Sequence, residues 1–260
     1  MRVRFWGTRG SLPTALNGTH IKAKLARALA LSVGHDLSSP RAIDEFIESR
    51  LDFATRATFG GNSSCVQLDT GNEHYTICDM GSGLRELGIE AMRHQTNRPQ
   101  VFDIFLSHLH WDHIMGFPFF TPAFVPQNVI RIHGCHTQLE SALRAQNAEP
   151  GFPVEFSDLP ARIEFVQLQP DHDYEIGGLQ VRAHLQAHGG DSYGYRFEHR
   201  QDRADEKVVV YSTDGEHRLD DAEQLQGMID LYQDADLVIF DAMYSLADSV
   251  SLKEDWGHSS

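Results

Sequence analysis

Four side chains of the kind that bind metal ions fall within one short run: His108, His110, Asp112 and His113. They directly follow residues 102–106, an apolar stretch that is typical of a buried strand. The period of two along a strand end points His108 and His110 to one side, and a turn then brings Asp112 and His113 around to a neighbouring point. This pattern predicts a site for two divalent ions, which can clamp the attacking and leaving oxygens and acidify a bridging water.

The run from Ser107 to His113 resembles the signature of the metallo-β-lactamase superfamily. The resemblance implies that His108 and His110 bind one metal ion, and that Asp112 and His113 bind the other. In a hydrolytic mechanism, Asp112 is also placed to orient the nucleophile. Residues 59–65 and 79–83 resemble the G-G-N-S-S and D-x-G-S-G segments of the cyclic-nucleotide phosphodiesterase and ribonuclease-Z-like branch, in which Asp79 is expected to orient a ligand histidine.

Two later residues extend the implied metal set. His188 precedes two glycines and resembles the third histidine of the first metal, although this copy lacks the family's usual proline. His184, earlier on the same expected strand, is the competing candidate, and the glycines favour His188. Asp214 ends another apolar strand and resembles the aspartate that bridges both ions, where a carboxylate offsets the repulsion between two dications. We expect the other histidines to be surface or strand-end residues, among them His133, His136, His172 and His217.

The end of the chain continues the resemblance. Residues 240–244 and 256–260 resemble the D-A-x-Y-S and G-H-S-S segments of the same branch. The resemblance implies that His258 binds no metal but contacts the scissile phosphate and stabilises the leaving oxygen. The family pattern runs on through a helix and a strand to a last histidine that completes the second metal site. Because this sequence stops at Ser260, we expect a truncated chain; the alternative is a second site that is one ligand short.

Short strands, turns and helices recur in two similar halves, which indicates sheets packed face to face with helices outside. We therefore expect an α/β (α+β) fold, the four-layer αββα sandwich of the metallo-β-lactamases, lacking its last C-terminal elements. Strands are expected at 2–5, 64–68, 75–78, 102–106, 129–133, 162–167, 179–185, 194–198, 207–212 and 237–240. Helices are expected at 84–92, 138–145 and 222–231.

No linker or repeat divides the chain, so we expect a single domain over residues 1–260. A helical hairpin interrupts it at about residues 15–57, with its two helices at 21–31 and from Ser39 to Leu51. The apolar faces of this hairpin must be covered, so it could be a lid over the cleft or a subunit contact in a homodimer.

Charge and composition limit the partners. The formal net charge is −15, which makes a long nucleic acid an awkward partner because phosphate binding depends on clustered Lys and Arg. The three cysteines are odd in number and form no C-x-x-C pair, which is typical of buried residues in a reducing cytoplasm. No signal peptide and no stretch of ~18 apolar residues is present, so we expect a cytoplasmic protein without a membrane span.

The expected function is that of a metal-dependent hydrolase with two divalent ions. We expect a phosphodiesterase that acts on a small cyclic or dinucleotide phosphodiester through a metal-bridging hydroxide. Imidazole and carboxylate ligands suit zinc, and manganese or iron can also occupy such sites. A lactonase or thioester hydrolase of the same fold remains open, because the fold does not determine the substrate. So does a sensor module that binds metal without turnover.

Overall fold

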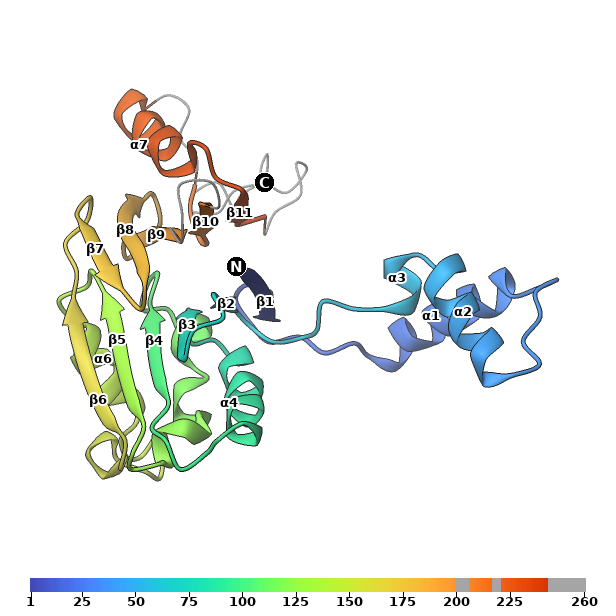
Figure 1. Cartoon of the computed structure of the whole chain (residues 1–260), viewed down its shortest axis with the longest axis horizontal. Helices are drawn as coiled ribbons and strands as arrows, with labels where there is room; N and C mark the ends of the chain where they lie inside the picture. Colours follow the sequence, from blue (N-terminus) through green and yellow to red (C-terminus); the bar gives the residue numbers. More distant parts are fainter. Residues whose placement is uncertain (200–205, 217–220, 243–260) are drawn as a thin grey trace.

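A computed structural model of the chain describes residues 1–199, 206–216 and 221–242. Two β-sheets lie face to face (Figure 1). The first sheet has the order β1 (Arg2–Gly7), β2 (Cys65–Asp69), β3 (His74–Cys78), β4 (Val101–Phe105), β5 (Val129–Gly134) and β6 (Arg162–Gln167). The second has the order β11 (Leu237–Phe240), β10 (Lys207–Ser212), β9 (Ser192–His199), β8 (Leu179–Gln186) and β7 (Asp173–Ile176). Strands β3 to β6 run parallel, so their carboxyl ends meet at one edge of the sheet.

Aromatic side chains fill the space between the two sheets. The ring of Phe105, at the end of β4, lies 5.6 Å from that of Tyr195 and 5.1 Å from that of Phe197, both on β9. All three side chains are fully buried, and burying each one stabilises the fold by roughly 1.5–3 kcal/mol. The end of β4 is therefore held rigidly, immediately before the histidine run begins.

Helices cover the outer faces. On α4 (Gly83–Arg93), the buried residues Leu84, Leu87 and Ala91 follow helical spacing along one side. The same holds for Leu139 and Leu143 on α6 (Leu139–Gln146), while α7 (Ala222–Tyr232) lies beside the second sheet (Figure 1). The expected four-layer αββα arrangement is confirmed. No helix in the described part of the chain is both long enough and apolar enough to span a lipid bilayer.

Residues 15–57 form an arm that projects away from the sheets (Figure 1). It contains α1 (Gly18–Leu31), α2 (Pro40–Arg50) and the short α3 (Phe53–Arg56). Ser39 caps α2 through the backbone N–H of Ala42, with Pro40 in the first turn, as the sequence predicts. The third helix was not anticipated, because a single turn leaves no periodic pattern.

Candidate metal centre

The histidine run leaves the carboxyl end of β4 and turns at once into α5 (Trp111–Ile114). The turn is supported from the second sheet, since the buried hydroxyl of Tyr195 donates to the carbonyl of Leu106 at 2.7 Å. His110 stands at the N-cap of α5, and the N–H of His113 bonds to its carbonyl at 3.0 Å. One helical turn is therefore enough to bring Asp112 and His113 beside the two histidines that precede it.

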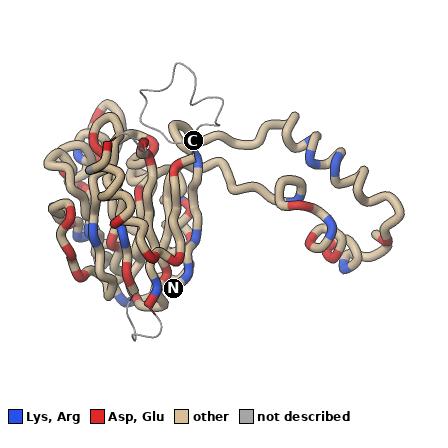
Figure 2. The backbone as a smooth tube through the Cα atoms, turned by 90° about the horizontal axis from the view of Figure 1, so that it is seen from above, with Lys and Arg blue, Asp and Glu red and all other residues tan. Residues whose placement is uncertain are grey.

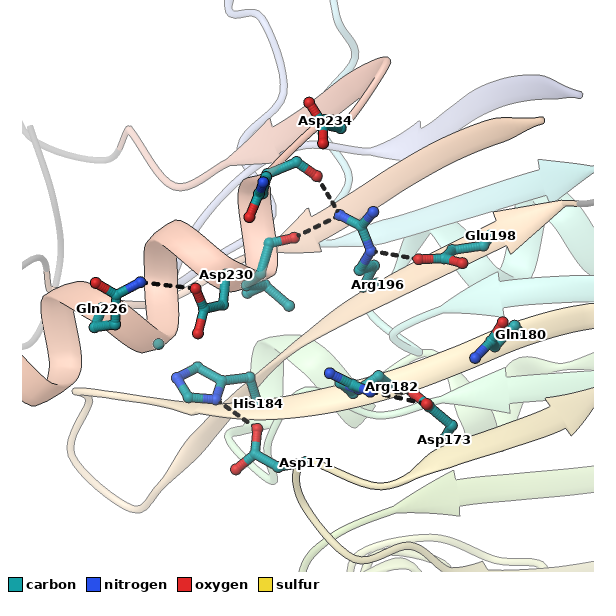
Figure 3. A pocket seen from close by; sticks show the side chains of 13 residues that line it. Asp171, Asp173, Gln180, Arg182, His184, Arg196, Glu198, Gln226, Asp230 and Asp234 are labelled. Carbon is teal, nitrogen blue, oxygen red and sulfur yellow. Dashed lines mark hydrogen bonds and ion pairs between the residues drawn. The ribbon is translucent and has the colours of Figure 1, made fainter. Parts of the chain in front are cut away.

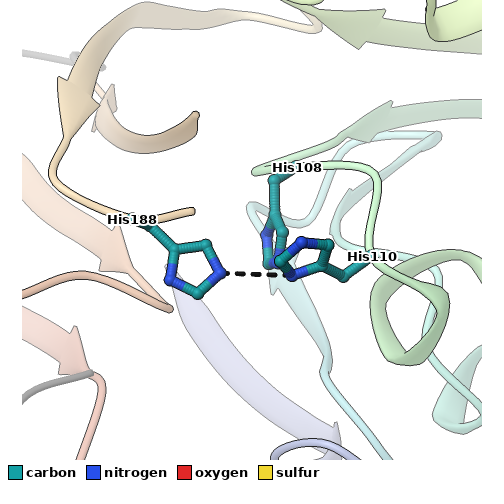
Figure 4. Close-up of side chains that lie close together, drawn as sticks. All are labelled: His108, His110 and His188. Atoms are coloured by element: carbon teal, nitrogen blue, oxygen red, sulfur yellow. Dashed lines mark hydrogen bonds between the residues drawn. The ribbon is translucent and has the colours of Figure 1, made fainter. Parts of the chain in front are cut away.

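Three imidazoles converge at the first candidate position (Figure 4). Nδ1 of His110 lies 3.0 Å from Nε2 of His108 and 3.2 Å from Nε2 of His188. Two nitrogens that are each about 2.0 Å from a tetrahedral ion are about 3.3 Å apart, so this spacing fits a zinc-type site. His188 comes from the loop after β8, far along the chain from the other two histidines, so the fold is needed to bring the three imidazoles together.

A second group of ligand atoms lies beside the first. Nε2 of His113 is 3.3 Å from a carboxylate oxygen of Asp112 and 3.3 Å from one of Asp214. The other oxygen of Asp214 is 3.7 Å from Nε2 of His108 and 3.9 Å from Nε2 of His188. The carboxylate of Asp214 therefore stands between the two groups, at the place where the resemblance puts a bridging ligand.

The buried Nε2 of His113 supports this fit. Among the residues that the structure describes, this atom makes no hydrogen bond, although it lies between two carboxylates. A buried imidazole nitrogen is normally hydrogen-bonded, and an exception calls for a binding partner such as an ion. The donor set of imidazole and carboxylate is also that of zinc hydrolases.

The fully buried carboxylate of Asp79 determines how His113 is presented. Asp79 adopts φ of 61° and accepts hydrogen bonds from Nδ1 of His113 at 2.6 Å, from the Tyr211 hydroxyl at 2.6 Å and from the Ser107 N–H at 2.8 Å. Because Nδ1 of His113 is engaged there, Nε2 is the nitrogen left to face the centre. Asp79 thus has the surroundings of a residue that orients a ligand histidine.

A backbone contact from the N-terminal loop orients Asp112. The N–H of Ser11 donates to Oδ2 of Asp112 at 2.8 Å, and Ser11 has a positive φ of 60°. A Cβ on Gly81 would lie 2.5 Å from the carbonyl oxygens of Asp112 and Ser64, so only glycine fits there. The backbone at Gly81 therefore packs directly against the loop that carries Asp112.

Burial and neighbouring charges determine the protonation states of the side chains in the centre. Burial and the neighbouring His113 hold the pKa of His108 well below its usual value, which leaves His108 neutral, as a metal ligand must be. Burial opposes charge on His113, but the carboxylates of Asp79 and Asp214 outweigh it and raise the pKa of His113 well above its usual value, so an ion bound at Nε2 would displace a proton from it. Burial likewise opposes charge on Asp112, yet His113 lowers its pKa, so Asp112 is a carboxylate at neutral pH.

His184 does not join the centre. Its Nδ1 lies 2.8 Å from a carboxylate oxygen of Asp171, in a cavity between the second sheet and α7 (Figure 3). That cavity has a volume of about 700 Å³, against about 240 Å³ for the cavity beside His113. Its two arginines are paired, Arg182 with Asp173 and Arg196 with Glu198, and Asp171, Asp230 and Asp234 leave it with an excess of acidic side chains. Of the two competing histidines, the structure brings His188 to His108 and His110.

Two of the histidines expected to be surface or strand-end residues lie at or just after the end of β5, and both are buried. His133 ends β5 but is buried, with Nε2 3.0 Å from Asp103. His136 is also buried, and its Nε2 lies 2.8 Å from the carbonyl of Asp191, in the loop that follows His188. Their burial leaves no local signal in the sequence, because the partners, the Asp103 carboxylate and the Asp191 carbonyl, lie far along the chain. His258 lies outside the described residues, as do His217 and most of the two C-terminal segments.

A smaller cavity of about 240 Å³ opens directly beside the centre. Its lining includes His113, Asp214 and Tyr211, and also Thr8, Arg9 and Asp241. Among its described lining residues, only Arg9 carries a permanent positive charge, which suits an anionic group placed next to the candidate ions.

Comparison with known proteins agrees with this arrangement. A family model described as "Beta-lactamase superfamily domain" matches residues 74–260. Ribonuclease Z of Staphylococcus haemolyticus is 29% identical over 140 residues, and that of Staphylococcus saprophyticus is 26% identical over 140 residues. Each alignment covers 51% of this chain and 42% of the relative, so the chain spans less than half the length of these relatives.

Solved structures show the same fold. The short form of human tRNase Z superimposes with a TM-score of 0.59 at 19% identity, covering 99% of this chain and 84% of that one. The metallo-beta-lactamase fold protein YhfI from Bacillus subtilis gives a TM-score of 0.55 at 18% identity, covering 76% of this chain and 69% of that one. Zn(2+)-bound PqqB from Methylobacterium extorquens gives 0.55 at 15% identity, covering 93% and 71%.

Proposed function

The chain belongs to the beta-lactamase superfamily, and from that premise we propose that it is a phosphodiesterase dependent on two divalent metal ions. The observation that carries the proposal is the convergence of His108, His110 and His188 beside a second group built from His113, Asp112 and Asp214. Zinc suits both groups, and manganese or iron fits the more oxygen-rich second one. When bound, two such ions supply neutralisation of phosphoryl charge and a water acidic enough to ionise near neutral pH.

The chain's own residues supply position and proton transfer. The Asp112 carboxylate, fixed by the N–H of Ser11, accepts a hydrogen bond from the attacking water and holds its lone pair toward phosphorus. The side chain of Arg9 lines the adjacent cavity and can pair with a phosphoryl oxygen. We assign the leaving-group side to His258, which the family resemblance implies and which lies outside the described residues.

A small phosphodiester, cyclic or dinucleotide, is the substrate class that the cavity of about 240 Å³ favours. The net charge of −15 also disfavours a long polyanion. The relatives named ribonuclease Z favour RNA as the second candidate substrate. Protection of a tRNA precursor in a footprinting assay would support RNA over the small substrate.

The first experiment is metal content followed by a substrate comparison. Purified protein should contain about two ions per chain and hydrolyse bis-p-nitrophenyl phosphate faster than any member of a lactone and thioester panel. Replacing Asp112 by Asn should lower kcat about 100-fold or more with little change in substrate binding. Faster turnover of lactones would assign the site to the alternative hydrolase class, and about one ion per chain without turnover would assign it to a sensor.

A further inference from the structure

Helix α1 displays an apolar stripe that nothing in the described chain covers. Ile21, Leu25 and Leu29 follow one another at four-residue spacing, and their exposed fractions are 44%, 59% and 67%. None of the 14 residues of α1 is buried. A helix of this length is only marginally stable in water without tertiary packing, so this face calls for a partner surface.

The arm itself provides little cover. Residues 15–57 bury only Phe46, Leu51 and Thr55, and polar side chains of α1 hold it to the segment around α3. Nζ of Lys24 donates to the carbonyl of Ala57 at 2.6 Å, and Arg27 pairs with Asp52. These contacts hold the side of α1 that carries Lys24 and Arg27 against α3. The apolar stripe of Ile21, Leu25 and Leu29 lies on a different side of the helix. Figures 1 and 2 both show the arm standing clear of the sheets.

The difference in net charge between the arm and the rest of the chain indicates which surface α1 would bind. Residues 15–57 contain six Lys or Arg and five Asp or Glu, a net charge of +1, whereas the whole chain carries −15, so the remainder carries −16. Within α1 the charged residues are Lys22, Lys24 and Arg27, with no acid (Figure 2). Two copies of α1 would repel each other, but α1 is complementary to the acidic body of another molecule of the same chain.

The attachment point of the arm makes a reciprocal exchange feasible. The chain segments that enter and leave the arm are joined by a hydrogen bond from the N–H of Thr14 to the carbonyl of Gly61, at 2.8 Å. Thr14 is only three residues after Ser11, whose N–H binds Asp112. The arm therefore leaves the body beside the candidate centre and reaches outward from it. A two-fold axis would let each arm lie on the other body with identical contacts.

We propose that residues 15–57 are a dimerisation arm, in which the Ile21–Leu25–Leu29 stripe and the adjacent Lys22 pack on the acidic body of a second copy. The occupant is another molecule of this chain, and the contact does not depend on which substrate the centre hydrolyses.

Light scattering after size-exclusion chromatography tests the proposal on the full chain. The parent should show twice the 29.3 kDa chain mass at micromolar concentration. Leu25→Glu keeps helix propensity but charges the stripe, and it should return the mass to one chain. Ala23→Glu adds the same charge on the far side of α1 and should leave the dimer intact. Far-ultraviolet circular dichroism of both variants verifies that the helices remain.

Lys22→Glu tests the charge argument separately, and it should raise the dimer dissociation constant about tenfold. A monomeric parent would overturn the proposal. So would a Leu25→Glu protein that keeps the mass of two chains, or a dimer that Lys22→Glu leaves unchanged. If the parent is monomeric and Leu25→Glu raises KM, the arm is instead a lid over its own cleft.

Discussion

Nδ1 of His113 lies 2.6 Å from Oδ2 of Asp79, and neither side chain reaches solvent. The hydroxyls of Tyr211 and Ser107 donate to the same carboxylate, so Asp79 has no freedom to turn away. The opposite nitrogen of His113 faces Asp112 and Asp214. This pair therefore determines which nitrogen His113 offers to the candidate centre.

We expect Asp79→Asn to weaken metal binding about 10- to 100-fold, in the range found for partners of ligand histidines. The amide that replaces one oxygen cannot accept hydrogen bonds, so at least one donor among His113, Tyr211 and Ser107 loses its acceptor. Competition with a chromophoric chelator, applied to metal-free protein, measures the affinity.

Asp103→Asn is the matched control for that experiment. Asp103 is equally buried and lies on the first sheet, but its partners are His133 and His74, away from the candidate centre. It should lower stability and leave metal affinity unchanged. Equal losses of affinity in the two variants would show that Asp79 acts only through general stability.

Most of the fold could be predicted because its strands carry local patterns. The strands at 162–167, 207–212 and 237–240 have the expected bounds, since each is an apolar or alternating run between turns. The strand β7 was missed. It has four residues at the sheet edge, each half-buried or exposed in alternation, and so carries too little hydrophobic signal.

The residues of the candidate site also differ in whether the local sequence reveals them. His108, His110, Asp112 and His113 could be recognised because they are contiguous. Ser11 could not, because its contact with Asp112 crosses 101 positions and uses a backbone N–H that any residue possesses. The Tyr211 hydroxyl reaches Asp79 across 132 positions, and its residue type suggests a core aromatic. Such long-range contacts form only because the fold brings distant segments together, and a single sequence does not show which segments will meet.

Replacing Ser11 tests whether its backbone positions Asp112. A β-branched residue at φ of 60° is strained by about 1–3 kcal/mol, so Ser11→Val should shift the loop and withdraw the N–H from Asp112. We expect kcat for a phosphodiester to fall about 10- to 100-fold while metal content stays constant. Ser11→Gly adopts the same φ without strain and should keep parental turnover. Similar rates for the two variants would argue against this role of the loop.

The choice between His188 and His184 can be decided by metal content. Nε2 of His188 lies 3.2 Å from Nδ1 of His110, whereas His184 pairs with Asp171 on the outer side of the second sheet. His188→Ala should reduce the bound metal from about two ions per chain to about one, because a site with two imidazoles holds zinc poorly. His184→Ala should keep both ions. Inductively coupled plasma mass spectrometry gives the counts, and the reverse pattern would move the third ligand to His184.

The buried pair of Asp103 and His133 should make stability depend on pH. Nε2 of His133 donates to the Asp103 carboxylate at 3.0 Å, and Nδ1 of His74 does so at 3.1 Å. Burial alone would raise the pKa of Asp103, but His133 and His74 outweigh it and hold that pKa below its usual value. A carboxylate with a lowered folded pKa stabilises the protein above its unfolded pKa of about 3.9, and this contribution disappears as the pH falls through the folded pKa.

Urea unfolding of the parent and of Asp103→Asn at a series of pH values measures that contribution. Near neutral pH the variant should be less stable by about 3 kcal/mol, because it leaves the buried imidazole of His133 without its carboxylate partner. The difference should stay level down to about pH 4 and then narrow as Asp103 of the parent becomes protonated. A difference that keeps its full size well below that pH would mean that hydrogen-bond geometry, and not the charge of Asp103, stabilises this part of the first sheet.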